Sequence, residues 1–332
     1  MLGKYWQNES RLIDREIRKA IVGEPKTLYG AAYYLPSIGG KRMRPFLTVL
    51  AGKLFGRIDR ATYLAGVGVE LLHSFTLIHD DIMDKDSLRR GNPTVHKKYG
   101  LPTAILASDM LFSKAFEVGA EAESLAGVTG LTRLLSNASI RIAEGQFFDM
   151  AFEKRKEVGV GEYLKMIDLK TGALFECATE AGGAIGAMKG GIRRTATKAE
   201  SDALVAYACN LGLAFQIHDD YLGTFGDPAK TKKPVGSDLR RGKKTYVVLA
   251  ALQRASSEQL KTLGRVLGNV NAEEGDVKIA LGELRDMRID FECHKITNHY
   301  TDEAVRSLTP LPDGQSKELL GELAQYAATR EN

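Results

Sequence analysis

The tetrapeptide Ile-His-Asp-Asp occurs twice in this chain of 332 residues, ending first at Asp81 and again at Asp220. Each copy stands at the end of a long apolar stretch. A pair of carboxylates at the end of a buried helix is costly unless a positive charge compensates it. The two copies therefore suggest a shared cation site, most simply divalent metal ions that hold a polyanionic substrate.

The first copy continues to a third carboxylate, in the order Asp80-Asp81-Ile-Met-Asp84. At 3.6 residues per turn, Asp84 lies about 40° from Asp80 around a helix, and Asp81 lies about 100° from it. All three carboxylates can therefore face one cavity. Hard oxygen ligands at this spacing suit Mg²⁺, which keeps several waters and shares substrate phosphates.

The second copy begins with Asp219 and Asp220 but has Gly223 where the first copy has its third aspartate. Basic residues accompany both copies, and arginine forks and lysine ammonium groups are what diphosphate recognition requires. Taken alone, each of these charges could simply be solvated, but with two aspartate clusters they indicate a site for two diphosphates and their metals. The basic residues are Lys41, Arg44, Arg89, Arg90, Lys170, Lys233 and Lys243.

The elements that must position these residues are helical almost throughout. Residues 61–84 contain no proline and carry apolar side chains at spacings of three and four, which predicts a helix. We find no hairpin pattern and no run of alternating β-branched residues. An all-α fold is predicted, with one domain over residues 1–332 built as a bundle of about ten or more helices around a central catalytic cavity. Further helices are expected over 114–125, 131–152, 162–188, 198–222 and 245–267.

Residues 226–244 differ from the rest, because they form a basic stretch directly after the second aspartate pair. Irregular segments of this length in a compact protein are usually functional or disordered. Since this one lies between two apolar helices, we expect a functional loop.

Composition restricts the classes of function. The chain is 44% hydrophobic and 27% charged, and its net charge of +4 is too small and too interspersed to favour nucleic acid. Three cysteines without metal-ligand spacing fit a reducing cytosol. The longest uncharged run, 203–218, is too short and too polar to span a membrane, and no secretory signal precedes it. A cytoplasmic protein without a transmembrane segment is expected.

The motifs resemble those of the trans-isoprenyl diphosphate synthases, the all-α prenyltransferases that join an allylic diphosphate to isopentenyl diphosphate. The resemblance covers residues 39–244 and is closest to the short-chain type. It rests on six motifs in the family's order: Gly-Gly-Lys-Arg-Met-Arg-Pro from Gly39, the first aspartate motif with its Arg-Arg-Gly, Gly145-Gln-Phe-Phe-Asp149, Lys170-Thr-Gly-Ala-Leu-Phe175, Phe215-Gln-Ile-His-Asp-Asp220, and Gly-Ser-Asp-Leu-Arg-Arg-Gly-Lys-Lys-Thr from Gly236.

The resemblance implies a role for each of the matching residues. Two Mg²⁺ ions would bind Asp80 and Asp84 with support from Asp81, and a third would bind Asp219 with Asp220 and Gln216 around it. The allylic diphosphate would be held by Arg89, Lys170, Gln216, Lys233 and Lys243. Isopentenyl diphosphate would be held by Gly40, Lys41, Arg44, His73 and Arg90. At the reaction centre, catalytic roles are implied for Gln146, Lys170, Thr171 and Lys243, with Asp149 beside them.

The implied reaction is ionisation of the allylic diphosphate, attack by the double bond of isopentenyl diphosphate, and loss of a proton to the released diphosphate. The cavity must be dry, because water would capture the carbocation. The resemblance also implies a homodimer. The C-terminal sequence lacks the strongly basic ending with which many members close the site, so no closing role is assigned to it.

Product length is expected to depend on the residues that precede the first aspartate pair. Phe75 stands five residues before Asp80, about 7.5 Å along the helix axis, and Thr76 stands four before. In the family a bulky residue at the fifth position with a small one at the fourth resembles the 20-carbon type, so geranylgeranyl diphosphate is the predicted product. A product of 15 carbons, or of 25 or more, remains the alternative. Leu72 and Val69 lie further along the same face and are candidates for a deeper limit.

Two other classes share parts of this pattern. A class I terpene cyclase also carries an aspartate-rich motif on an all-α fold, but Asp219, Asp220 and the isopentenyl diphosphate residues argue against it. A non-catalytic subunit of a heteromeric synthase usually lacks one of the aspartate motifs, and this chain keeps both.

Overall fold

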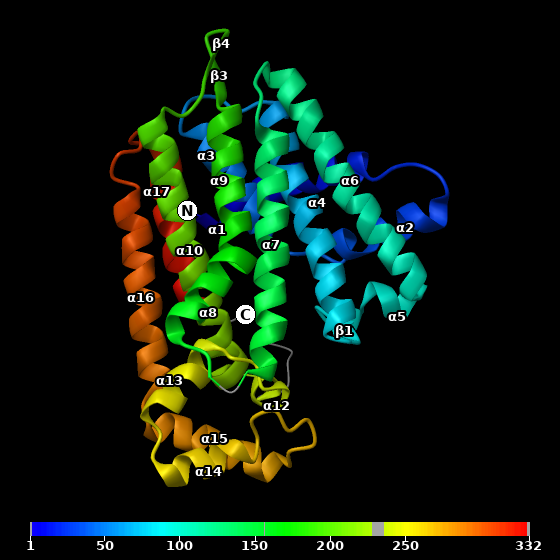
Figure 1. The fold of residues 1–332 in the computed structure, drawn as a ribbon. Helices are drawn as coiled ribbons and strands as arrows, with labels where there is room; N and C mark the ends of the chain where they lie inside the picture. Colours follow the sequence, from blue (N-terminus) through cyan, green and yellow to red (C-terminus); the bar gives the residue numbers. More distant parts are fainter. Residues whose placement is uncertain (1, 156, 228–235, 331–332) are drawn as a thin grey trace. The chain divides into compact units, whose positions relative to one another are not determined.

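A computed structural model describes residues 2–155, 157–227 and 236–330, and those residues are almost entirely helical (Figure 1). This confirms the predicted all-α fold class. The chain forms two compact units: a first unit of Met1–Ser139, Leu174–Ala206 and Ser307–Glu322, and a second unit of Ile140–Ala173, Tyr207–Arg306 and Leu323–Asn332. The expectation of a single domain stays a prediction.

The helices of the first unit are α1 (Leu2–Ala20), α2 (Lys26–Ser37), α3 (Met43–Lys53), α4 (Arg60–Met83), α5 (Val95–Tyr99) and α6 (Leu101–Ala126). It also contains the hairpins β1 (Leu88–Arg89) with β2 (Asn92–Pro93) and β3 (Ala187–Lys189) with β4 (Ile192–Arg194). The second unit contains α8 (Val160–Ile167), the π-helix η1 (Asp168–Gly172), α12 (Ser237–Arg241), α13 (Tyr246–Arg254), α14 (Ser257–Gly264) and α15 (Glu274–Asp286). Residues of both units occur in α7 (Leu131–Lys154), α9 (Ala173–Ile185), α10 (Lys198–Phe225), α16 (Ile289–Ser307) and α17 (Gln315–Thr329).

Helix α4 carries the first aspartate motif and packs along α6 in the first unit (Figure 1). A Cβ added to Gly68 would lie 3.1 Å from the carbonyl oxygen of Ala115 in α6, so glycine allows the two helices to approach closely. Burying each large aliphatic side chain of α4 contributes about 1.5–3 kcal/mol. These buried side chains include Leu64, Val67, Leu71 and Ile78, as the helical spacing predicts.

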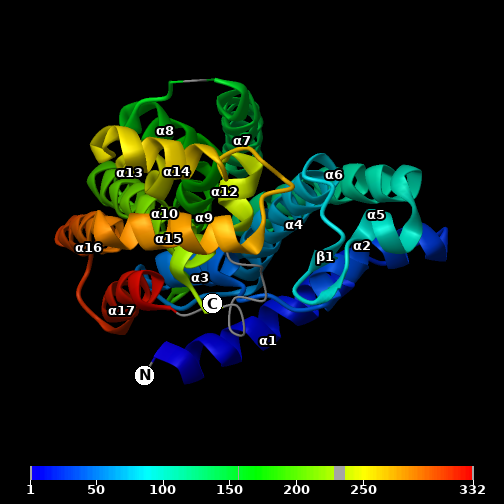
Figure 2. The ribbon, with the colours of Figure 1, turned by 90° about the horizontal axis from the view of Figure 1, so that it is seen from below.

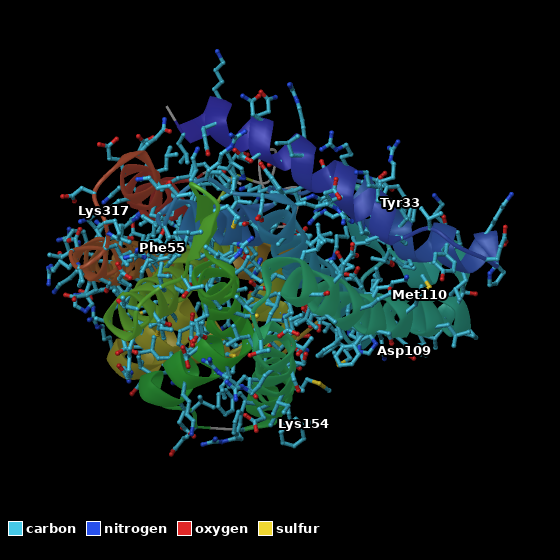
Figure 3. The ribbon with its side chains drawn as sticks, turned by 90° about the horizontal axis from the view of Figure 1, so that it is seen from above. Tyr33, Phe55, Asp109, Met110, Lys154 and Lys317 are labelled. Carbon is cyan, nitrogen blue, oxygen red and sulfur yellow. The ribbon has the colours of Figure 1, made fainter. Side chains whose placement is uncertain are left out.

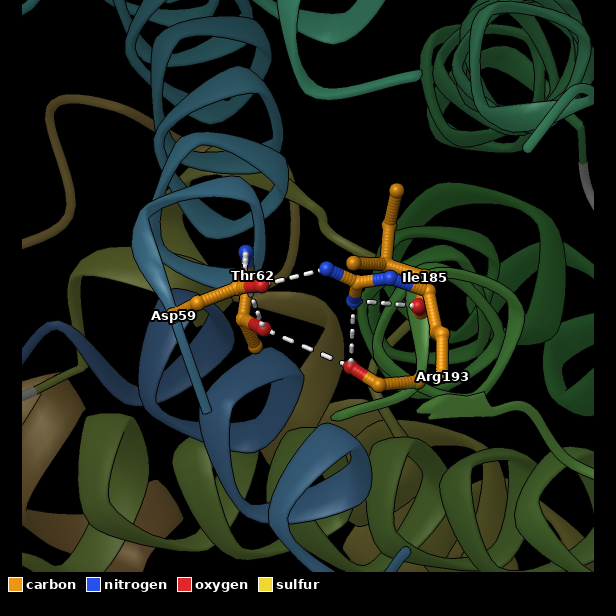
Figure 4. A network of polar contacts seen from close by, with 5 residues as sticks. Asp59, Thr62, Ile185 and Arg193 are labelled. Carbon is orange, nitrogen blue, oxygen red and sulfur yellow. Dashed lines mark hydrogen bonds and ion pairs between the residues drawn. The ribbon is translucent and has the colours of Figure 1, made fainter. Parts of the chain in front are cut away.

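The start of α4 is fixed by a polar network (Figure 4). Asp59 caps the helix by accepting a hydrogen bond from the backbone N–H of Thr62 at 3.3 Å. Arg193 of β4 forms an ion pair with Asp59 and donates to the carbonyl oxygen of Ile185 at 2.8 Å. Helix α4 is therefore anchored at its first turn, at the end opposite to the aspartates.

Among the described residues, α4 is the one helix long and apolar enough to cross a membrane by length and composition. Its most apolar stretch of 18 residues is 72% buried inside the structure, as in a core helix, so the helix gives no reason to propose a membrane span.

Three expectations about the elements are wrong. Two hairpins are present, because Arg90-Gly91 and Gly190-Gly191 take the left-handed backbone of tight turns, and strands this short leave no alternating pattern in the sequence. The helix expected over 162–188 is interrupted by η1 and ends at Ile185, and Met188 lies in β3. The helix expected over 245–267 is divided where Ser256 caps α14 by accepting from the backbone of Gln259.

The second unit is built on two hydrophobic clusters. One lies among α12 to α16, where α14 and α15 pack side by side (Figures 1 and 2). The other joins Tyr163 and Ile167 of α8 to Ile217 of α10 and Leu249 of α13. This second cluster underlies the second aspartate motif.

Candidate active site

The first aspartate motif occupies the last turn of α4, and its three carboxylates differ in environment. Asp81 is buried, and its Oδ1 accepts a hydrogen bond from Nε of Arg89 at 2.8 Å. The hairpin β1–β2 returns the chain so that Arg89 reaches this carboxylate. Burial raises the pKa of Asp81 to about 6 despite the arginine. Asp80 and Asp84 are only partly buried, which leaves them accessible to metal ions.

Arg44 and His73 form a basic corner in the first unit. Nη1 of Arg44 lies 3.2 Å from Nε2 of His73, and the guanidinium stacks on the ring of Phe175 at 4.5 Å. Burial lowers the pKa of Arg44 to about 10, so it is charged at neutral pH, and lowers the pKa of His73 well below its usual value. Within the described residues, buried Nε of Arg44 has no hydrogen-bond partner, which suits an incoming phosphate oxygen.

Arg42 lies between Lys41 and Arg44 in the sequence motif but has a structural role that the sequence reading missed. It is buried, pairs with Glu70 at 2.9 Å and also donates to Asp14 at 2.7 Å. Lys41, by contrast, is exposed.

Gly40 has a clear steric reason to be glycine. A Cβ added there would lie 2.9 Å from Nη1 of Arg90, and its φ of +152° is unfavourable for other residues. This places Gly40 and Arg90, both predicted to hold isopentenyl diphosphate, beside one another.

A row of aromatic side chains runs between α4 and α6. The ring of Phe75 lies 4.4 Å from that of His79 and 5.0 Å from that of Phe112, which in turn lies 4.9 Å from Phe116. Thr76 donates to the carbonyl oxygen of His73 at 2.8 Å.

Ser108 of α6 is buried, and its hydroxyl lies 2.8 Å from Nε2 of His79. The next residue, Asp109, labelled in Figure 3, is exposed on the outer side of α6. The side chain of Ser108 therefore faces the interior, and that of Asp109 faces solvent. We assign to Ser108 only its contact with His79.

In the second unit, the π-helix η1 presents Lys170 and Thr171. Nζ of Lys170 lies 2.6 Å from Oδ2 of Asp149 in α7. A Cβ added to Gly145 would lie 2.4 Å from the backbone nitrogen of Lys170, so glycine permits α7 to touch the backbone of η1. Buried Oε1 of Gln146 has no hydrogen-bond partner within the described residues. Such π-turns occur often at functional sites.

The second aspartate pair is divided between a partly exposed and a buried carboxylate. The side chain of Asp219 is 45% exposed, and its Oδ1 accepts from Nη2 of Arg330 at 3.3 Å. Arg330 also stacks on the ring of Phe215 at 3.8 Å, and sequence reasoning missed this contact because the tail was not basic enough to attract notice. Asp220 is buried, and burial raises its pKa to about 7.

The space of the missing third aspartate in the second motif is occupied by Asp238 of α12. A Cβ added to Gly223 would lie 2.7 Å from Oδ2 of Asp238. The charge of Asp238 also contributes to the raised pKa of Asp220. Lys243 follows α12, with its backbone N–H bonded to the carbonyl oxygen of Asp238 at 3.0 Å, whereas Lys233 lies outside the described residues.

Gly223→Asp completes the second motif by sequence, yet we expect it to lower activity. Its Cβ would meet the Asp238 carboxylate, and a new carboxylate there would repel it. We predict a tenfold or greater fall in kcat/KM and a lower melting temperature, measured by product formation and thermal unfolding. Combining the change with Asp238→Asn should restore part of both. Activity equal to or above the wild type in the single variant would contradict the prediction.

The predicted site residues thus fall into two groups, each assembled within its own unit. The first unit brings Arg89 to Asp81, and Arg44 to His73. The second unit brings Lys170 to Asp149. That the two aspartate motifs share one cavity stays a prediction.

Comparison with known proteins decides the family. The polyprenyl synthetase family model matches residues 25–284. The chain belongs to the polyprenyl synthetase family. It is 38% identical to the geranylgeranyl diphosphate synthase of Saccharolobus solfataricus, over 99% of this chain and 98% of that protein. It is 40% identical to the geranylfarnesyl diphosphate synthase of Aeropyrum pernix, over 96% and 99% of the two chains.

A solved structure agrees with the assignment. The geranylgeranyl pyrophosphate synthetase of Pyrococcus horikoshii superposes with a TM-score of 0.90 at 36% identity, covering 99% of this chain and 98% of that one. As a polyprenyl synthetase, the protein is a trans-prenyltransferase enzyme, which confirms the family and the enzyme class expected from the six motifs.

Proposed function

We propose that this polyprenyl synthetase extends an allylic diphosphate with isopentenyl diphosphate and releases geranylgeranyl diphosphate as its main product. The observation that carries the proposal is the combination of two aspartate motifs with the basic corner of Arg44 and His73. A cyclase that binds a single diphosphate would have no use for that corner. The names of the relatives support the 20-carbon product, and the Aeropyrum protein keeps a 25-carbon product as the alternative.

The accessible carboxylates fit the metal dependence of the family. Asp80, Asp84 and Asp219 are partly exposed carboxylates, the hard oxygen ligands that Mg²⁺ prefers. We propose that they hold three Mg²⁺ ions, with Asp81 and Asp220 as supporting residues. When bound, Mg²⁺ would neutralise the diphosphate that leaves the allylic substrate.

The residues of the chain would contribute positioning and charge. Arg89, Lys170, Gln216, Lys233 and Lys243 would hold the allylic diphosphate, and Gly40, Lys41, Arg44, His73 and Arg90 would hold isopentenyl diphosphate. Because Arg44 remains protonated while His73 is neutral, this corner offers a fixed positive charge and a hydrogen-bonding partner that does not titrate near neutral pH. Fixed charges of this kind stabilise a departing diphosphate without reorganisation.

The carbocation left by ionisation would be attacked by the double bond of isopentenyl diphosphate. Gln146 and the hydroxyl of Thr171 would stand near it, and the released diphosphate would take the final proton. Lys170, paired with Asp149, would keep its charge directed toward the diphosphate.

Phe75 is proposed as the floor of the tunnel in which the prenyl chain grows. Its ring is braced by Phe112, whereas the adjacent Thr76 is small and bonded to its own helix. A braced aromatic is a firmer floor than a single mobile ring, because its displacement would have to move a second ring.

Phe75→Ala is expected to lengthen the product beyond 20 carbons, because the variant removes the ring that the growing chain would meet. The measurement is the chain length of radiolabelled products after reaction with isopentenyl diphosphate. Phe55→Ala, in a buried position of the first unit labelled in Figure 3, serves as the control: it should lose stability and keep the product length. Unchanged product length in the Phe75 variant would remove this residue as the floor.

The proposed function is tested by incubating the purified chain with allylic primers of 5, 10 and 15 carbons, isopentenyl diphosphate and Mg²⁺, followed by product sizing. Accumulation of a 20-carbon diphosphate supports it. A main product of 15 or 25 carbons replaces the proposed length. No turnover of any primer would overturn the function and favour a subunit that acts only with a partner.

We further propose that the enzyme is a cytoplasmic homodimer. Support for the compartment comes from its three cysteines, none of which is joined in a disulfide within the described residues. Sedimentation of the purified chain would test the dimer.

A further inference from the structure

Four side chains of the second unit form a continuous chain of hydrogen bonds. The hydroxyl of Tyr163 donates to Oδ2 of Asp220 at 2.5 Å. Nε2 of Gln216 donates to Oδ1 of the same carboxylate at 3.2 Å. The hydroxyl of Thr171 donates to Oε1 of Gln216 at 3.0 Å. The four residues come from α8, η1 and α10, so the chain of bonds ties three elements to one another.

Tyr163 lies at the buried end of this chain. It is 1% exposed and packs in the cluster with Ile217 and Leu249, where a phenylalanine ring would pack equally well. Burying a hydroxyl in such a place is costly unless it is hydrogen-bonded. Its bond to Asp220 offsets that cost, and the hydroxyl therefore has a use that the packing of the ring does not explain.

Asp220 uses both of its oxygens inside the protein. Oδ2 accepts from Tyr163 and from the backbone N–H of Tyr246 at 3.2 Å, while Oδ1 accepts from Gln216. These three bonds hold the carboxylate toward the interior of the unit. Its neighbour Asp219 is partly exposed and is the better ligand, which leaves Asp220 a different task.

The chain of bonds has a direction. The amide of Gln216 turns its NH₂ group toward Oδ1 of Asp220 and its oxygen toward the hydroxyl of Thr171, the arrangement that an ionised Asp220, which only accepts, requires. The hydroxyl hydrogen of Thr171 is then committed to that oxygen. The lone pairs of the hydroxyl are left for other groups, which is the polarity that a developing cation requires.

We propose that Tyr163 is a positioning residue for the prenyl transfer: by holding Asp220 it fixes the amide of Gln216 and, through it, the orientation of the Thr171 hydroxyl. The inference rests on the proposed function, which places Thr171 near the carbocation. It assigns to a core tyrosine, outside all six sequence motifs, a part in the chemical step.

The test compares Tyr163→Phe, Thr171→Ala and the double variant in the full-length enzyme. Tyr163→Phe should lower kcat about tenfold, the cost typical of losing a supporting hydrogen bond around a catalytic site, with KM for isopentenyl diphosphate changed less than twofold. The double variant should be no slower than Thr171→Ala alone, because the tyrosine acts through the threonine. Tyr300→Phe, at a tyrosine that packs against the same cluster, is the matched control and should keep kcat.

Two results would overturn the proposal. A Tyr163→Phe enzyme with unchanged kcat and a lower melting temperature would show that the hydroxyl serves only the core. Losses that multiply in the double variant would show that the tyrosine acts independently of Thr171. Failure of the proposed function is separate, since it would appear as an inactive wild-type enzyme in the same assay.

Discussion

Asp80→Ala is expected to lower kcat roughly 1,000-fold. The loss corresponds to about 4 kcal/mol of transition-state stabilisation, the scale on which a metal ion acts at a departing charged group. After the larger effect of burial, the charge of Asp80 also contributes to the raised pKa of Asp81, so the variant should lower that pKa. The measurements are steady-state turnover over a range of Mg²⁺ concentrations and thermal unfolding without metal.

The neighbouring carboxylate of Asp81 is expected to matter for folding stability. Asp81→Ala leaves the Arg89 guanidinium without this partner, and because that side chain is only partly buried, the loss of the charge-assisted hydrogen bond costs about 1.5–3 kcal/mol of folding stability. Asp302→Ala, at an exposed position of α16, is the control for removing a charge and should change neither turnover nor stability. If Asp80→Ala kept more than a tenth of wild-type turnover, the first motif would not be the metal site.

Gly145→Ala is expected to be the most damaging methyl group that can be added near the reaction centre. Its Cβ would lie 2.4 Å from the backbone nitrogen of Lys170 and 2.7 Å from the Cα, so η1 and α7 must separate. Overpacking of this type costs about 1–3 kcal/mol. A displacement of about 1 Å at a catalytic group can lower the rate by about 100-fold. We therefore expect kcat to fall by about that factor, as measured with saturating substrates.

Gly161→Ala in α8 is the matched control. A Cβ there meets nothing within 4 Å, so the variant should keep its activity and gain up to about 1 kcal/mol from better helix propensity. The measurements are the melting temperature by circular dichroism and the turnover of both variants. Equal behaviour of the two would show that the contact between α7 and η1 does not matter for catalysis.

The parts of the fold that the sequence predicts well are those governed by local periodicity. Helix α4 follows its apolar spacing, and α10 begins at the residue expected. Features that depend on a few backbone angles were not predictable in the same way. Arg90 bends a hairpin whose strands are too short to show alternation, and one hydrogen-bonding change turns the middle of a long expected helix into η1.

The site residues likewise differ in how well the sequence predicts them. The aspartate and lysine motifs are recognisable because the chemistry restricts which residue types can serve. The different roles of Arg42 and Arg44 could not be predicted. The structural role of Arg42 depends on its left-handed backbone and on Glu70, 28 residues away. The partner of Tyr163 lies 57 residues away, and no local pattern records such a contact.

The π-helix η1 also has a consequence for insertions and deletions. A π-turn holds one more residue than an α-turn, so it shifts the angular phase of the side chains that follow by about 100°. Deleting one residue of Asp168–Gly172 would give a more regular helix, with better backbone geometry and a lower energy of its own. Lys170 and Thr171 would then lose the phase that sets them toward Asp149 and Gln216. At this turn the chain can have either a regular helix or the orientation of Lys170 and Thr171 that catalysis requires. It keeps the extra residue.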